Sequence, residues 1–190
     1  LDFGLVLAAP TAEAEAELQG LNWVALKARA GEVAAVGIPN ITLAARDLSV
    51  DLNLVAGVPD GVDADQRVID FMAEGAEPYR VTTGTGSSLT LDMPGSSGML
   101  VRAGGTMDVR LGNFFEFSGS MGLEHRAQTV TLSDGKQAQT DMLSLGGSDL
   151  SGFVGIGPYR SDVNGDGVVG TNELNPNARG LGLRGVEFGL

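Results

Sequence analysis

Residues 128–140 read Gln-Thr-Val-Thr-Leu-Ser-Asp-Gly-Lys-Gln-Ala-Gln-Thr, and this stretch decides the fold class. Apolar and polar side chains alternate on both sides of Asp134-Gly135, which is typical of strands whose side chains point to opposite faces. Asp-Gly between two such runs favours a tight turn, because glycine readily takes the positive φ that a short hairpin loop needs. The stretch therefore predicts an antiparallel β-hairpin.

The same period of two extends outward along most of the chain, whereas residues 11–18 fit either a helix or a strand. In residues 48–53 we expect the apolar members to point inward and the polar members outward; they are Leu48, Val50 and Leu52 against Ser49, Asp51 and Asn53. Glycine and proline divide the runs into about ten to thirteen short strands. This pattern predicts an all-β, Gly-rich antiparallel module over residues 1–190, built as an elongated sandwich, a barrel or a solenoid-like stack.

Composition excludes several classes of function. The 190 residues include 29 glycines, which disfavour long helices, one histidine and no cysteine. Without cysteine there is no zinc cluster, iron–sulfur centre, disulfide or thiol nucleophile. A catalytic triad would have to use His125 as its histidine, and no nucleophile motif accompanies that residue. We therefore expect that the protein is not an enzyme and has no catalytic residues.

Charge and hydropathy narrow the partners further. Twelve basic against 24 acidic residues give a net charge of −12, so the chain lacks the basic surface that nucleic-acid binding requires. Its apolar runs are only a few residues long, which predicts no membrane span. The first residues carry no signal-peptide pattern, and a start at Leu1 suggests a piece of a longer protein.

Residues 162–173 read Asp-Val-Asn-Gly-Asp-Gly-Val-Val-Gly-Thr-Asn-Glu and match the calcium-loop pattern D-x-[DN]-x-[DN]-G-x5-E. Calcium takes six to eight oxygen ligands, and alternate positions of a curled loop all point to its centre. Gly167 permits the sharp turn, and Val169 is expected to pack against the core. We expect one Ca²⁺ to be bound by the side chains of Asp162, Asn164, Asp166 and Glu173. The main-chain carbonyl of Val168 is expected to supply a further ligand.

These twelve residues resemble the EF-hand calcium loop, but the flanking residues do not resemble its helices. Residues 151–160 contain three glycines and a proline, and residues 174–177 contain another proline. The calcium-loop region, residues 151–180, is therefore expected to act as a structural clip and not as a switch.

The whole chain is similar in style to the repeats of giant secreted bacterial surface or adhesin-like proteins, being acidic, Cys-free and Gly-rich. That resemblance implies a stalk or scaffold at the cell surface, with neighbouring repeats of the same chain as partners and a surface ligand that is unknown. The alternative function is a barrel or sandwich that binds a glycan or an apolar ligand.

The two ends of the chain carry similar sequences. Residues 1–5 read Leu-Asp-Phe-Gly-Leu and residues 186–190 read Val-Glu-Phe-Gly-Leu. We interpret them as equivalent strands of consecutive repeats, with residues 1–10 as the end strand of a preceding repeat, each at an end of the fold or a sheet edge. Chance similarity between two short apolar strands is the alternative. A second calcium site at Asp60, Asp63 and Asp65 competes with the simpler interpretation of a solvated loop.

Overall fold

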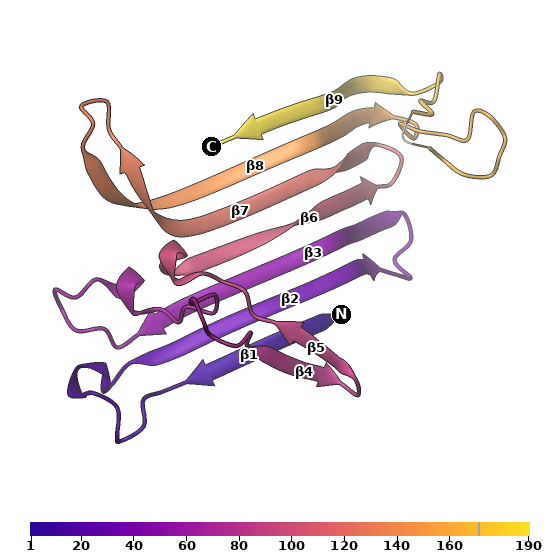
Figure 1. Cartoon of the computed structure of the whole chain (residues 1–190). Coiled ribbons are helices and arrows are strands. Elements are labelled where there is room, and N and C mark those ends of the chain that lie inside the picture. Colours follow the sequence, from indigo (N-terminus) through magenta and orange to yellow (C-terminus); the bar gives the residue numbers. More distant parts are fainter. Residues whose placement is uncertain (171) are drawn as a thin grey trace. The chain divides into compact units, whose positions relative to one another are not determined.

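The computed structural model describes residues 1–170 and 172–190. These residues form nine strands and three 3-10 turns and no α-helix, which confirms the all-β prediction (Figure 1). The strands are fewer and longer than the ten to thirteen short ones expected, since β8 alone has 20 residues. No helix in this described part is long and apolar enough to cross a membrane. The strands are β1 (Asp2–Ala8), β2 (Asn22–Ala35), β3 (Ile41–Ala56), β4 (Arg80–Gly84), β5 (Ser87–Thr90), β6 (Leu100–Leu111), β7 (Phe115–Thr131), β8 (Gln137–Ile156) and β9 (Arg179–Gly189). The 3-10 turns are η1 (Ala16–Leu18), η2 (Ala64–Arg67) and η3 (Gly95–Ser97).

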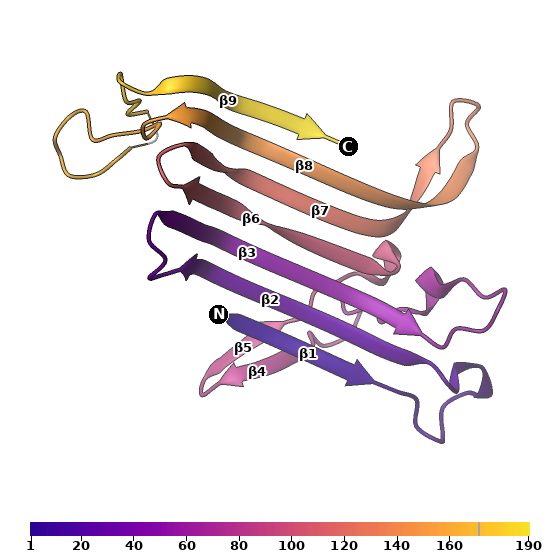
Figure 2. The same cartoon turned by 180° about the vertical axis from the view of Figure 1, so that it is seen from behind.

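Seven of the strands form one sheet in the order β1-β2-β3-β6-β7-β8-β9, and β4 and β5 form a separate hairpin. Figures 1 and 2 show this order from two opposite sides. Pairing is antiparallel between β1 and β2 and between β8 and β9. Because the order ends at β1 on one side and at β9 on the other, the sheet is open, and the barrel among the expected architectures is wrong for the described residues.

The hairpin predicted at Asp134-Gly135 is confirmed. It joins β7 to β8, with Gly135 at φ 83° and the Leu132 N–H donating to the Lys136 carbonyl over 2.7 Å. The Asp134 side chain accepts the Lys136 N–H over 3.1 Å, and this hydrogen bond lowers the pKa of the Asp134 carboxyl. Local turn chemistry therefore determined this part of the fold.

The chain divides into two compact units. The first comprises Leu1–Ala30, Ser49–Ala103 and Leu123–Ser144, and the second comprises Gly31–Leu48, Gly104–Gly122 and Leu145–Leu190. The calcium-loop region lies in the second unit. That residues 1–190 form one repeat module, preceded by an end strand at 1–10, stays a prediction.

The core of the first unit lies where the segment between β3 and β6 returns over the sheet. Leu91 and Met93 are fully buried, and they pack with Phe71, Leu100 and Ala25 of β2. Burial of such side chains contributes about 1.5–3 kcal/mol each. This core holds the β4–β5 hairpin against β1 and β2.

In this unit β3 presents the opposite face from the one predicted. Asp51 and Asn53 are 5% and 0% exposed, although the alternation placed them outward. Asp51 accepts two hydrogen bonds from Arg102, at 2.8 and 3.0 Å, and Asn53 donates to the Ile69 carbonyl over 2.8 Å. These hydrogen bonds make the burial of the two side chains tolerable, although the Oδ1 atoms of Asp51 and Asn53 are buried without a partner among the described residues. The hydrogen bonds to Asp51 also raise the pKa of the Arg102 guanidinium.

Candidate calcium loop

The loop of residues 162–173 connects β8 to β9, and its two ends are tied together. Arg160 and Leu174 form an isolated antiparallel bridge, and the Ser161 N–H donates to the Glu173 carbonyl over 3.1 Å. The first and last predicted calcium ligands, Asp162 and Glu173, each lie directly inside this closure. The backbone therefore brings together the two ends of the predicted ligand set.

The Asp162 carboxylate organises the first half of the loop. Its oxygens accept the N–H groups of Gly165 at 2.6 Å, Asp166 at 3.2 Å and Gly167 at 2.9 Å. Gly165 and Gly167 take φ of 79° and 84°, in the left-handed region that favours glycine. The loop thus curls around the side chain at its first position.

The Glu173 carboxylate organises the second half. It accepts the Gly170 N–H over 2.6 Å and the Asn164 N–H over 3.3 Å. Asp166 accepts the Val168 N–H over 2.8 Å and the Asn164 side-chain amide over 3.1 Å. All four predicted side-chain ligands are consequently joined in one hydrogen-bonded loop.

The oxygen atoms of these side chains are suitable ligands for a hard cation such as calcium, but the carboxylates are not close enough together to share one ion. Within residues 1–170 and 172–190, no group of three or more Asp, Glu or His side chains is close enough together to hold a metal ion. The oxygens of Asp162, Asp166 and Glu173 have further lone pairs beside those that accept N–H groups. Calcium binding stays a prediction, and it requires these three carboxylates to come closer together than they are here.

The residues that attach the loop to the sheet were not predicted. Val169, the expected apolar anchor, is 43% exposed. Arg160 instead places Nη1 3.0 Å from Oε1 of buried Glu116, and its Nη2 donates to Ser151 over 3.0 Å. The loop is therefore held through the residues that precede it, by a buried ion pair between Glu116 of β7 and Arg160, which follows the end of β8 at Ile156.

An aromatic stack supports the same attachment. The Phe153 and Tyr159 rings are stacked at 4.8 Å, and the Arg160 guanidinium lies 5.9 Å from the Tyr159 ring centre. Gly155 and Gly180 make room for Phe153, since a Cβ at either would lie 2.5 or 2.9 Å from its ring. The glycines that flank aromatic residues in 152–159 were the available sequence signal for this packing.

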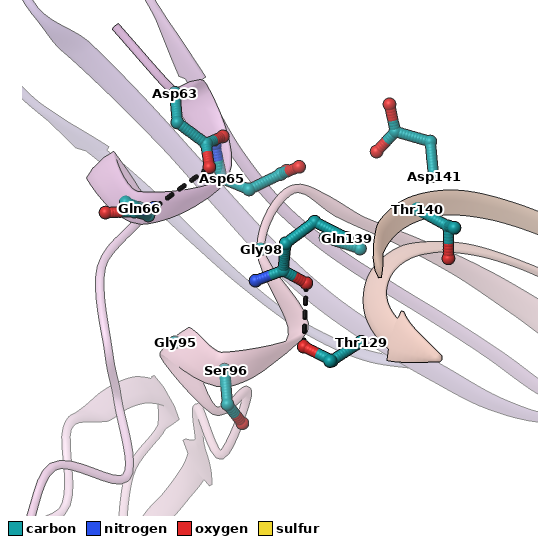
Figure 3. A pocket seen from close by; sticks show the side chains of 11 residues that line it. Asp63, Asp65, Gln66, Gly95, Ser96, Gly98, Thr129, Gln139, Thr140 and Asp141 are labelled. Carbon is teal, nitrogen blue, oxygen red and sulfur yellow. Dashed lines mark hydrogen bonds between the residues drawn. The ribbon is translucent and has the colours of Figure 1, made fainter. Parts of the chain in front are cut away.

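The acidic cluster at 60–65 has a structural explanation. Asp63 accepts the Asp65 N–H and the Gln66 amide, both over 3.0 Å, and Asp65 accepts the Met99 N–H over 2.8 Å. These two side chains line a hollow of about 330 Å³ in the first unit, which Figure 3 shows, and Asp60 is not part of its lining. The carboxylates hold η2 and η3 in place, which favours the solvated-loop interpretation over a second calcium site.

The hollow also bears on the alternative function. Its lining is polar, with Thr129 and Gln139 hydrogen-bonded across it over 2.7 Å (Figure 3). None of its described lining residues is aromatic, so a sugar ring has no stacking surface there. The hollow therefore gives no specific support to glycan binding.

In comparisons with known proteins, no family model, no curated protein and no solved structure matches this chain.

Proposed function

We propose that the chain is a calcium-stabilised structural repeat of a secreted or cell-surface bacterial protein of the adhesin-like kind, and that it serves as stalk or scaffold. The observation that carries this proposal is the loop of residues 162–173. It combines a complete oxygen-ligand pattern with ends tied by the Arg160–Leu174 bridge. Its partners are then neighbouring repeats of the same chain.

The surroundings of the loop favour a clip over a switch. β8 ends at Ile156 and β9 begins at Arg179, so the loop joins two paired strands of one sheet. A sensor of the EF-hand type acts by changing the angle between two helices. A loop between paired strands has no such lever, and calcium there would stabilise the start of β9.

Electrostatics explain why an ion would matter. Asp162, Asp166 and Glu173 bring three negative charges into one twelve-residue loop of a chain whose net charge is −12. These charges repel one another, and a divalent cation removes that repulsion. For a dissociation constant of about 10⁻⁵–10⁻³ M, calcium at an extracellular concentration of about 1 mM would occupy the site from nearly completely at the tight end of that range to about half at the weak end.

Calcium is expected to raise the melting temperature of the chain. At a free concentration about 100 times the dissociation constant, binding to the folded state alone adds about 2.7 kcal/mol. For a domain of this size that corresponds to a rise of about 5–10 °C. Calorimetric melting in calcium and in chelator measures it, and an unchanged melting temperature would contradict the proposal.

Two variants show where the ion acts. Asp162→Ala combined with Glu173→Ala should abolish the calcium-dependent shift, because both ends of the ligand set are lost. The matched control is Asp134→Ala, which removes an exposed carboxylate from the β7–β8 turn and should retain the full shift. A shift that survives the double substitution would place the ion elsewhere.

A further inference from the structure

In the part of the chain that the structure describes, β9 pairs with β8 on one side and with no strand on the other, and it is exposed along its whole length. All eleven of its residues are exposed, including Leu181 at 70% and Leu183 at 57%. Leu190 and Leu145 exchange both backbone hydrogen bonds, at 2.9 and 3.0 Å, so Leu190 faces β8. Because these groups alternate along a strand, Gly189 presents its N–H and C=O to the free edge. An open edge of this kind readily accepts another strand.

The opposite edge of the sheet shows what such a strand could be. In β1, Asp2 lies opposite Arg29 of β2, and Gly4 lies opposite Lys27. Aligning Phe-Gly-Leu of the two edge strands places Glu187 at the position of Asp2. A second copy's β2 paired with β9 would therefore again have a carboxylate opposite Arg29, a favourable cross-strand pair.

Each edge strand also makes a packing contact that the other lacks. A Cβ at Gly4 would lie 2.9 Å from Cβ of Val81, because β4 packs directly over β1. A Cβ at Gly189, its counterpart, would have nothing within 4 Å among the described residues, and its φ is not positive, so no contact in the described part of the chain requires glycine there. A glycine at that position is explained if Val81 of another copy packs over it.

For the phenylalanines of the two edge strands, it is the residue of β9 that packs within its own chain and the residue of β1 that is exposed. The Phe188 ring lies over Gly147, at 2.6 Å from where a Cβ would stand, whereas Phe3 is 58% exposed. One strand that belonged to both copies would make both contacts, with its Phe over Gly147 of its own copy and its Gly under Val81 of the next. Each edge of the sheet thus supplies one of the two packing contacts that such a shared strand would make.

We propose that β9 of one copy serves as the first strand of the next copy's sheet. It pairs antiparallel with β2 of that second copy in the place of β1, with Glu187 opposite Arg29 and Gly189 opposite Lys27 and under Val81. This inference rests on the proposed function, since it takes the chain to be one of several consecutive repeats. The inference adds to that function the strand with which β9 pairs, the register of the pairing, and the contact with Val81 that favours this register.

A tandem protein tests the junction. It consists of the complete chain followed directly by a second copy that starts at Val6, so that residues 186–190 stand where residues 1–5 of the second copy would be. Gly189→Val is introduced at the junction of the tandem and, as the matched control, in the single chain. Gly4→Val in the single chain shows how large the clash with Val81 is. All are melted in calcium and in chelator.

In the single chain we expect Gly4→Val to lower the melting temperature by about 5 °C, because of overpacking, and Gly189→Val to leave it unchanged. In the tandem, Gly189→Val should lower the melting temperature of the second copy as Gly4→Val does in the single chain. The Gly189 amide should also exchange its hydrogen slowly in the unsubstituted tandem and rapidly in the single chain.

Two results would overturn the proposed junction. One is a tandem whose melting temperature is unchanged by Gly189→Val, and the other is a Gly189 amide hydrogen that exchanges as fast in the tandem as in the single chain. Neither result touches the calcium shift of the single chain. Loss of that shift would instead count against the proposed function, so the two failures are distinguishable.

Discussion

Arg160→Met is expected to lower the free energy of unfolding by about 3 kcal/mol, the lower end of the range for breaking a buried pair, because it removes the nearer cation of buried Glu116 and leaves only Arg110, whose Nε lies 3.6 Å from the other carboxylate oxygen. The side chains of Arg160 and Glu116 are each only 8% exposed, and their closest oxygen and nitrogen are 3.0 Å apart. Urea unfolding at constant calcium concentration measures the loss.

A second substitution separates the ion pair from general damage to the loop. Glu116→Gln in the Arg160→Met background should recover part of the loss, since it removes the uncompensated charge. Arg126→Met is the matched control: it breaks the more exposed pair with Glu124, at 2.8 Å, and should cost under about 1 kcal/mol. If Arg160→Met costs no more than this control, the buried pair does not anchor the loop.

Leu91→Ala is expected to cost about 2–5 kcal/mol, the range for truncating a fully buried leucine. Leu91 is 0% exposed, and its N–H donates to the Tyr79 carbonyl over 2.9 Å. The cavity would loosen the β4–β5 hairpin from β1 and β2. Urea unfolding checks this value, with Leu143→Ala as the control, because Leu143 is 65% exposed and should change stability by less than about 0.5 kcal/mol. Equal losses in the two variants would contradict the assigned core.

Features encoded within a few neighbouring residues could be predicted from the sequence. The Asp134-Gly135 turn and the all-β character follow from local alternation and turn chemistry, and both are confirmed. The ligand pattern of residues 162–173 is equally local, and its ends are indeed joined by the bridge between Arg160 and Leu174. Calcium itself stays a prediction.

Features that depend on distant partners could not be predicted. The buried face of β3 was assigned wrongly because the partner of Asp51 is Arg102, on another strand 51 residues away. The attachment of the loop depends on Glu116, which precedes Arg160 by a whole hairpin. The barrel was wrong because alternation predicts strands without indicating whether the two outer ones meet.

The inverted face of β3 has a consequence for how the first unit folds. A strand with alternating apolar and polar residues can turn either set toward a sheet's covered side, and a slip of one residue exchanges them. The polar set is acceptable there only after its partners arrive. For Asn53 that partner is the Ile69 carbonyl, in the segment that follows β3, and for Asp51 it is Arg102 of β6. The choice of face is therefore made by contacts that are distant in sequence, and such contacts form late because chain entropy opposes their closure. We therefore expect β3 to acquire its final orientation only when β6 and the segment between β3 and β6 have docked.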